Sequence, residues 1–256
     1  MLDTSLTISK VAARYRELIN PVASLGFIGL ATDRASLADF RAFVEPFQGV
    51  AIHATRIPFA PVATVETLKE MEVHLKTGAE LLVPGQPLQT ISFSCTSGTI
   101  AIGLDNVRRQ IQSVRPDSTV VTPIGGAIKG LETLGARKIS VLMPYLHKTA
   151  RMVADFMEAS GFTLDAVSTF DLNGDPEMNL IDPDCIFDEA VKVCQPSSDA
   201  LFISCTGWLT HPVIDRLEKA LGRPVITSNQ ALAWQALREA GVKDQTAGQG
   251  VLFSQF

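Results

Sequence analysis

The sequence predicts an α/β protein made of two similar lobes, each with a four-stranded parallel sheet flanked by helices. Short apolar runs rich in β-branched residues alternate with amphipathic segments, the pattern of parallel strands joined by helical crossovers. These runs fall into two matching sets of four. In addition, the phrase Ser-Cys-Thr follows the third run of each set, at residues 94–96 and 204–206. A repeated phrase in the same register indicates a duplicated lobe.

The predicted strands follow the apolar runs in chain order. In the first lobe they span residues 24–31, 50–55, 90–94 and 118–122. In the second lobe they span residues 138–143, 164–170, 200–204 and 224–228. The spacing from the end of the first strand to the cysteine is nearly the same in both sets.

Three segments between the strands carry clear helix boundaries: 122–135, 210–222 and 228–241. Each begins with Thr or Ser, which suit the N-cap, and closes with Gly, which suits the position after the last turn. Pro123 and Pro212 stand where a first helical turn tolerates proline. These boundaries predict helices on the crossovers.

The two sets of strands define the expected domains. We expect a first lobe of residues 1–121 plus 229–256, because the last helix continues beyond the second set of strands, and a second lobe of residues 122–228. Both lobes are predicted to be Rossmann-like. Since ligands bind at the carboxyl ends of strands in open parallel sheets, we expect the active-site cleft between the lobes.

Composition excludes several classes of protein. The net charge is −5 and the basic residues are scattered, which argues against a nucleic-acid partner. No apolar run approaches the roughly 20 residues that cross a bilayer, and the start lacks a secretory pattern. Four cysteines are too few for a disulfide scaffold, and isolated histidines without a C-x-x-C pair predict no metal site. We therefore expect a cytoplasmic protein with reduced thiols.

The candidate catalytic residues are Cys95 and Cys205, one at a strand end in each lobe. We expect each thiol to lie near a helix N-terminus, where N–H groups and the helix dipole favour a thiolate. Thiols on opposite walls of a cleft can exchange protons with both faces of a carbon, or one can add to a C=C bond that the other protonates. The adjacent Thr96, Ser97 and Thr206 can donate hydrogen bonds to a substrate carboxylate.

The alternative for any single cysteine is a small apolar filler, since cysteine is among the most buried residue types. We give Cys185 and Cys194 that interpretation, because neither is repeated in register. His211, six residues after Cys205, can relay a proton, although a surface position at a helix start is the commoner role.

These residues carry a resemblance. The two cysteine segments, "TPIGGAIKGLETLGARKISVLMPY" and "PVITSNQALAW" resemble the aspartate/glutamate racemase superfamily. Within it, the chain looks closest to the branch of maleate cis-trans isomerases and arylmalonate decarboxylases. The opening "GFIGLATDRASLADFRAFV", with "CTSGT" and "TSNQALAW", looks most like the racemase-like proteins of ectoine utilization. The resemblance implies a cofactor-free enzyme, and it favours a homodimer.

The resemblance also implies roles for particular residues. Decarboxylases of this branch keep only the second-lobe cysteine, so two cysteines favour an isomerase or racemase. In the maleate isomerases the first cysteine, here Cys95, adds to the substrate double bond, while the second handles the proton. A tyrosine after the first strand of the second lobe binds substrate, which is Tyr145 here. Thr122, where the fourth strand meets its helix, is a further candidate for substrate binding.

Two positions depart from the maleate isomerases, where asparagines hold substrate carboxylates. Ala35 replaces the first asparagine, and Asp175 replaces the second, with Asn173 nearby. A carboxylate at such a position repels an anion and favours a cation. We therefore expect a substrate with a carboxylate and an amino or amidinium group, such as an ectoine-derived amino acid. Asp33 and Arg56, each close to the end of a first-lobe strand, are further candidates for binding it.

The sequence thus predicts a cysteine-pair isomerase or racemase of a small amino or carboxylic acid. Three alternatives stay open: cis-trans isomerization of maleate, decarboxylation of a malonate, and small-molecule binding without chemistry.

Overall fold

The computed structural model describes residues 8–15 and 22–256. The stretch in which we sought a secretory pattern lies partly outside these residues. No helix in the described part of the chain is long and apolar enough to span a membrane.

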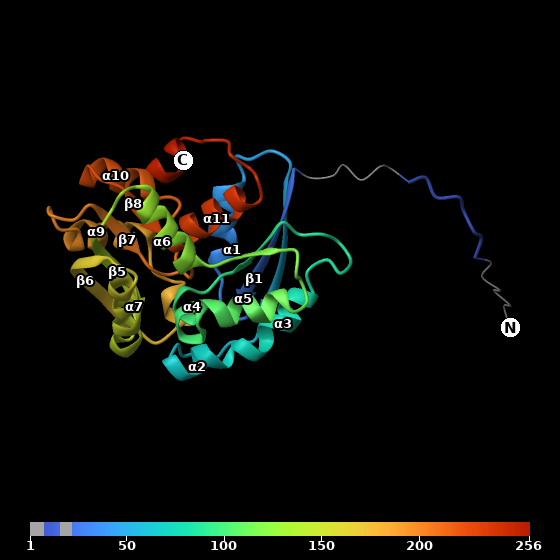
Figure 1. Ribbon diagram of the computed structural model, residues 1–256, viewed down its shortest axis with the longest axis horizontal. Helices are drawn as coiled ribbons and strands as arrows, with labels where there is room; N and C mark the ends of the chain where they lie inside the picture. The colour runs from blue at the N-terminus through green and yellow to red at the C-terminus, as the bar shows by residue number, and fades with distance from the viewer. Residues whose placement is uncertain (1–7, 16–21) are drawn as a thin grey trace, which may run out of the picture.

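Two parallel four-stranded sheets form the framework of the molecule (Figure 1). The first has the order β2-β1-β3-β4, and the second has the equivalent order β6-β5-β7-β8. The first sheet consists of β1 (Ala23–Leu30), β2 (Val50–Ile57), β3 (Thr90–Phe93) and β4 (Thr119–Val121). The second consists of β5 (Lys138–Tyr145), β6 (Thr163–Leu172), β7 (Ala200–Ile203) and β8 (Val225–Thr227). All eight predicted strands, and the matching of the two sets, are confirmed.

The register places the two cysteines at equivalent positions. In the first sheet the last paired residues of β1 and β3 are Ile28 and Phe93. In the second sheet the last pair of β5 and β7 is Leu142 and Ile203. In these pairs, Phe93 lies two residues before Cys95 and Ile203 lies two residues before Cys205, each at the carboxyl end of its sheet.

Helices connect the strands and cover both sheets. Those between the first-lobe strands are α1 (Ser36–Val44), α2 (Val65–Glu70), α3 (Glu72–Glu80), α4 (Thr96–Ile102) and α5 (Leu104–Gln112). Those that follow are α6 (Pro123–Thr133), α7 (His147–Ala159), α8 (Asp175–Met178), α9 (Pro183–Val193), α10 (Ile214–Leu221), α11 (Ser228–Glu239) and α12 (Val251–Gln255).

The predicted helix boundaries hold at α6 and shift at the other two helices. The Thr122 hydroxyl caps α6 by accepting the Gly125 N–H at 3.2 Å. At α11 the cap is Thr227, one residue earlier than predicted, because its hydroxyl forms a capping box with Gln230. Thr210 is not the cap of α10, which begins only at Ile214.

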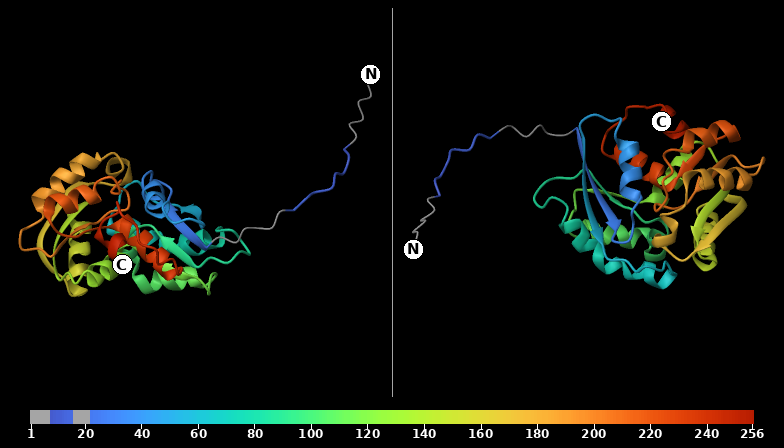
Figure 2. Two further views of the ribbon diagram at one scale, coloured as in Figure 1. Left: turned by 90° about the horizontal axis from the view of Figure 1, so that it is seen from above. Right: turned by 180° about the vertical axis from the view of Figure 1, so that it is seen from behind.

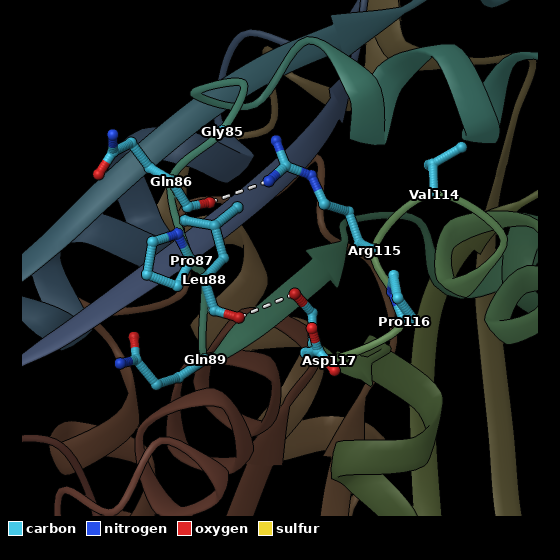
Figure 3. A pocket seen from close by; sticks show the side chains of 10 residues that line it. Gly85, Gln86, Pro87, Leu88, Gln89, Val114, Arg115, Pro116 and Asp117 are labelled. Carbon is cyan, nitrogen blue, oxygen red and sulfur yellow. Dashed lines mark hydrogen bonds between the residues drawn. The ribbon is translucent and has the colours of Figure 1, made fainter.

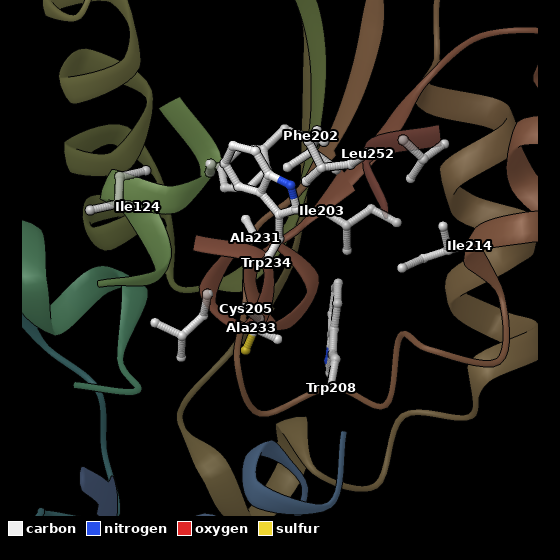
Figure 4. Packing of buried hydrophobic residues seen from close by; sticks show 14 of the residues in the cluster. Ile124, Phe202, Ile203, Cys205, Trp208, Ile214, Ala231, Ala233, Trp234 and Leu252 are labelled. Carbon is white, nitrogen blue, oxygen red and sulfur yellow. The ribbon is translucent and has the colours of Figure 1, made fainter. Parts of the chain in front are cut away.

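The main hydrophobic core runs between the lobes. Buried residues of both sheets pack together with α6 and α11, as Phe27, Phe202 and Leu232 illustrate. Figure 4 shows Phe202, Trp234 and Leu252 in this cluster, which also contains Cys205. A second cluster, with Ile91 at its centre, lies on the other face of the first sheet beneath α3 and α5. The shared core holds the two sheet ends close to each other.

The end of the chain packs against both lobes. Helix α11 contacts α1 and β3 of the first lobe, and also α6 and β8. From α12, the Phe253 ring stacks on Phe43 of α1 with centroids 5.9 Å apart. Figure 2 shows this C-terminal segment between the lobes. The assignment of residues 229–256 to the first lobe therefore stays a prediction.

Candidate active site

A narrow cavity of about 20 Å³ lies where the carboxyl ends of the two sheets meet. A space of this size holds about one water molecule. Most of the predicted site residues line it: Asp33, Cys95, Thr96, Ser97, Tyr145, Asp175, Cys205 and Thr206. The rest of the lining is mainly apolar and consists of Leu30, Phe59, Ala63, Leu68, Met178 and Gly207. The cleft expected between the lobes is thus present as a narrow cavity.

A larger hollow of about 540 Å³ lies at the opposite end of the first sheet, lined by residues 85–89 and 114–118 (Figure 3). Arg115 lines this hollow, and its guanidinium group donates hydrogen bonds to the carbonyl oxygens of Ala79 and Gln86. This arginine therefore ties loops together. The hollow contains neither thiol, so the small cavity is the candidate site.

Cys95 occupies the N-cap of α4 in an extended conformation. Its Sγ atom accepts the backbone N–H of Gly98 at 3.3 Å. A side chain at position 98 would not fit, because a Cβ atom there would lie 2.8 Å from this sulfur and 2.4 Å from Met71 Cε. Glycine thus allows the amide donor to approach the thiol.

Cys205 has a similar donor in a different local structure. Its Sγ atom accepts the backbone N–H of Gly207 at 3.2 Å. The residues that follow form turns, and α10 begins only at Ile214. The expectation of a helix N-terminus beside this second cysteine is therefore wrong. A single amide of the turn replaces it.

The expected lowering of the thiol pKa values is also wrong for this buried site. Burial raises the pKa of Cys95 to about 12, and the charge of Asp175 adds to the effect. Burial likewise raises the pKa of Cys205 well above its ordinary value, again with a contribution from Asp175. One amide donor per sulfur does not offset the loss of water. Both thiols are therefore neutral at neutral pH in this structure.

Tyr145 lies at the end of β5 and is buried in the cavity wall. Burial and the neighbouring Cys205 raise the pKa of its phenol well above the ordinary value. The hydroxyl therefore stays protonated and can donate a hydrogen bond to a substrate. This position agrees with the substrate-binding role that the resemblance implies.

Two carboxyl groups enter the cavity from opposite lobes. Asp33, in the loop between β1 and α1, uses Oδ1 to accept the N–H groups of Ala35 and Ser36 at 2.7 and 3.0 Å. Asp175, the first residue of α8, accepts the Thr32 hydroxyl at 2.5 Å. Burial, together with the charge of Asp33, raises the pKa of Asp175 to about 6.

Thr96 and Thr206 line the cavity while linking elements across it. The Thr96 hydroxyl donates to Ser228 Oγ at 2.8 Å. The Thr206 hydroxyl donates to the Ser94 carbonyl at 3.2 Å. Their hydroxyl protons are thus engaged within the protein, whereas Ser97 Oγ lies 4.0 Å from Cys95 Sγ.

The structure leaves three predicted binding residues out of the cavity lining. Arg56 donates to the carbonyl oxygens of Leu30 and Asp33, so it supports the β1–α1 loop from behind. Asn173 bonds to Glu177 on an exposed face. Thr122 caps α6, as described above.

His211 also lies outside the cavity lining. Its ring packs edge-on against Phe43 with centroids 4.9 Å apart. Its backbone N–H donates to Asp39. The packing role is therefore the one that the structure supports for this histidine.

Sequence reasoning missed the group that holds the Cys205 loop. The Asp39 carboxylate on α1 accepts the Thr210 N–H at 3.0 Å and the Thr210 hydroxyl at 2.8 Å. Asn229 on α11 donates to this carboxylate at 2.9 Å and to the Thr206 carbonyl at 3.0 Å. The sequence did contain a signal, because Asp39 interrupts an apolar helix face. The structure shows that this residue is only 2% exposed.

Together, the fold and the site define a two-lobed α/β protein with a pair of buried thiols in the cavity between its lobes. Comparison with known families gives a match over residues 90–253 to the arylmalonate decarboxylases. The chain belongs to this enzyme family, and the predicted branch of the superfamily is confirmed.

Individual relatives agree with this assignment. A maleate isomerase of Alcaligenes faecalis is 22% identical over 218 residues, which cover 82% of this chain and 85% of that protein. An arylmalonate decarboxylase of Bordetella bronchiseptica is 29% identical over 128 residues, covering 49% of this chain and 52% of that protein.

A solved structure confirms the two-lobed fold. It is a mutant of the maleate cis-trans isomerase of Nocardia farcinica with a covalently bound succinylcysteine intermediate. It superposes with a TM-score of 0.83 at 20% identity, covering 91% of this chain and 99% of that one.

Proposed function

We propose that the protein is an isomerase in which Cys95 and Cys205 act as a thiol pair on a small unsaturated carboxylic acid. The observation that carries the proposal is the position of both thiols in one narrow cavity, each at the carboxyl end of a different sheet. Similarity to a maleate isomerase over 82% of the chain supports cis-trans chemistry as the first candidate.

The proposed reaction begins when the Cys95 thiol loses its proton to solvent as the cavity opens, and the thiolate adds to one carbon of the double bond. A C–S bond forms as the π bond breaks, and the Cys205 thiol transfers its proton to the neighbouring carbon. The new single bond rotates. Cys205 then removes a proton, the C–S bond breaks, and the trans alkene leaves with Cys95 again a thiolate and Cys205 again a thiol. The N–H groups of Gly98 and Gly207 stabilise negative charge on the two sulfurs.

A second candidate is racemization at the α-carbon of an amino acid. The same two thiols would remove a proton from one face and supply one to the other. The carboxyl groups of Asp33 and Asp175 favour this candidate, because an amino group is a better neighbour for them than a second carboxylate. A role in ectoine breakdown stays a prediction of the sequence, and no relative reported above bears on it.

The test is proton NMR of the protein in D₂O with maleate and, separately, with a panel of α-amino acids. Fumarate formed from maleate supports the first candidate, and deuterium at an α-carbon supports the second. Either activity is expected to disappear in both Cys95→Ser and Cys205→Ser. Matched controls are Cys185→Ser and Cys194→Ser, whose thiols lie outside the cavity lining and are expected to be dispensable. Turnover that survives in Cys95→Ser would refute the thiol pair.

A further inference from the structure

The Asp33 carboxylate has one oxygen without a partner. Its Oδ1 atom accepts two backbone N–H groups of the following turn. Its Oδ2 atom is buried and has no hydrogen-bond partner among the described residues. The residue is 4% exposed and lines the cavity between the lobes. Buried carboxylate oxygens are normally paired, so this atom is positioned for a donor that the protein itself does not supply.

Asp175 adds a second carboxyl group from the other lobe. It lines the same cavity, and among the described residues its side chain accepts a hydrogen bond from one neutral donor, the Thr32 hydroxyl. The two carboxyl groups are close enough for the charge of Asp33 to contribute to the raised pKa of Asp175. Both also act on the thiols of Cys95 and Cys205, whose pKa values they raise.

No lysine, arginine or histidine is found among the described residues that line the cavity. The nearby guanidinium group of Arg56 is directed to the carbonyl oxygens of Leu30 and Asp33. The ionizable groups of the lining are two carboxyls, two thiols and the phenol of Tyr145, all of which become negative when they lose a proton. A dianionic substrate would therefore meet like charges without a compensating cation.

We propose that the substrate carries an ammonium or amidinium group that donates hydrogen bonds to Asp33 and Asp175, together with a single carboxylate. This inference rests on the proposed thiol chemistry and names the class of its substrate. An ammonium group has three donors, which suits the free Asp33 Oδ2 and an oxygen of Asp175. The hydroxyl groups of Ser97 and Tyr145 remain as donors for the carboxylate.

The same cation supports the chemistry. Placed between the two carboxylates, it compensates the charge that opposes ionization of Cys95 and Cys205. Ionization of a thiol then becomes easier only when the correct substrate occupies the cavity. Within the described ranges, no group of three or more His, Cys, Asp or Glu side chains is placed to hold a metal ion. The two carboxyl groups therefore favour an ammonium group over a metal ion.

The experiment compares probes that differ in charge at one end. Binding of 4-aminobutyrate, succinate and butyrate is measured by isothermal titration calorimetry on the full chain. We expect 4-aminobutyrate to bind at least about tenfold more tightly than succinate, as one charge-assisted pair allows. We expect Asp175→Asn and Asp33→Asn to weaken 4-aminobutyrate about tenfold and to strengthen succinate. A reversal of preference is not a result that misfolding can produce.

A matched control is Asp184→Asn, which removes an exposed carboxyl group of α9 that is not part of the lining. It is expected to leave the preference unchanged. Tighter binding of succinate by the unaltered protein, or no binding of 4-aminobutyrate at millimolar concentration, would overturn the inference. Conversion of maleate to fumarate with a preference for succinate overturns it while leaving the proposed function intact. A preference for 4-aminobutyrate without turnover of any substrate supports the inferred ligand class and overturns the proposed function.

Discussion

The two sulfur atoms depend on glycines that allow an amide N–H to approach them. At Gly98 the limiting contacts are Met71 Cε and the Cys95 sulfur itself. At Gly207 the limiting contact is the side-chain amide of Asn179, 2.8 Å from an ideal Cβ position. In both loops the donor belongs to the backbone, so its direction is set by the fold and does not vary with a side-chain rotamer.

Substitution of Gly98 by alanine tests this arrangement. The new Cβ atom would lie 2.8 Å from the sulfur of Cys95, so either the thiol or the first turn of α4 has to move. We expect turnover to fall on the order of 100-fold, the cost of displacing a reacting group by about 1 Å. The measurement is kcat on the substrate identified by NMR.

The control for this substitution is Gly130→Ala on α6. Its Cβ atom would meet only flexible side-chain atoms of Leu252 and Ile226, at 3.3 Å or more. We expect this variant to keep full turnover. Equal turnover in Gly98→Ala and Gly130→Ala would show that the amide of Gly98 does not position the thiol.

The raised pKa of Asp175 predicts a pH-dependent stability. Its pKa in the folded protein is about 6, above the ordinary value of 3.8, so the folded state binds the proton more tightly. The resulting stabilisation is complete below about pH 4 and is lost as the pH rises through about 6. At roughly 1.4 kcal/mol per pKa unit, the loss amounts to about 3 kcal/mol.

Urea unfolding of Asp175→Asn measures this effect. Thr32, Asp33 and the two cavity thiols surround the carboxyl group and stay the same in the variant. We expect the unfolding free energy of the unaltered protein to fall relative to the variant between about pH 4 and about pH 7. Parallel pH profiles would show that Asp175 titrates near its ordinary pKa.

At the scale of elements, sequence reasoning succeeded for strands and failed for one loop. The strands are short apolar runs whose pattern is local, so they were predictable. Thr210 resembles an N-cap by the same local logic, yet its hydroxyl bonds to Asp39 and Thr227. Asp39 lies far away in the sequence, on α1 of the other lobe. A buried long-range acceptor outweighs a local capping preference.

The thiol pKa values escaped prediction for a related reason. The N–H donors of Gly98 and Gly207 belong to the local loops, and a backbone donor near each cysteine was predictable. The burial comes from elsewhere, since Phe59 and Leu68 of the first lobe and Met178 of the second cover the cavity. Which apolar side chains cover a site depends on how the lobes meet, which no local pattern contains.

Removal of the Asp39 side chain tests the link between α1 and the Cys205 loop. In Asp39→Ala, the N–H groups of Thr210 and His211 lose their acceptor, while the Asn229 amide keeps the Thr206 carbonyl. We expect the unfolding free energy to fall by about 3 kcal/mol, since each unsatisfied buried donor costs about 1–3 kcal/mol and the losses partly overlap.

Two further variants show whether the carboxylate acts as an acceptor. Asp39→Asn keeps one oxygen in place and is expected to lose less stability than the alanine variant. Asp155→Ala removes only an exposed partner of Arg151 and is expected to change stability by less than about 0.5 kcal/mol. If Asp39→Ala resembles Asp155→Ala in urea unfolding, the loop is held by its other contacts alone.

At the scale of the whole molecule, the cavity of this structure is too narrow for an organic acid. Its volume of about 20 Å³ matches a single water, so the walls have to part before a substrate enters. The lobes meet over the cavity where the Ala63 N–H donates to the Asn173 carbonyl at 2.7 Å. The Thr149 hydroxyl donates to the Ala63 carbonyl at 3.1 Å beside it. This contact is the place where opening is expected to begin.

Gly174→Ala is expected to force that contact open. A Cβ atom at position 174 would lie 2.1 Å from the Pro61 carbonyl oxygen, although the backbone there is extended and accepts any residue. The segment around Pro61 therefore has to move away from the second lobe. We expect Cys95 and Cys205 to react faster with iodoacetamide, because opening returns water to the thiols and lowers their pKa values. Turnover is expected to fall, because the site no longer closes around the substrate.

The control at the same edge is Lys148→Ala, which breaks an exposed ion pair to Glu66 between the lobes. Exposed pairs contribute little, about 0–1 kcal/mol, so alkylation and turnover are expected to stay close to those of the unaltered protein. If Gly174→Ala alkylates no faster than Lys148→Ala, the thiols are shielded by the apolar wall of Phe59, Leu68 and Met178, and opening has to involve those side chains. Faster alkylation in Gly174→Ala alone would assign the closing contact to the backbone of residues 61–63 and 173–174.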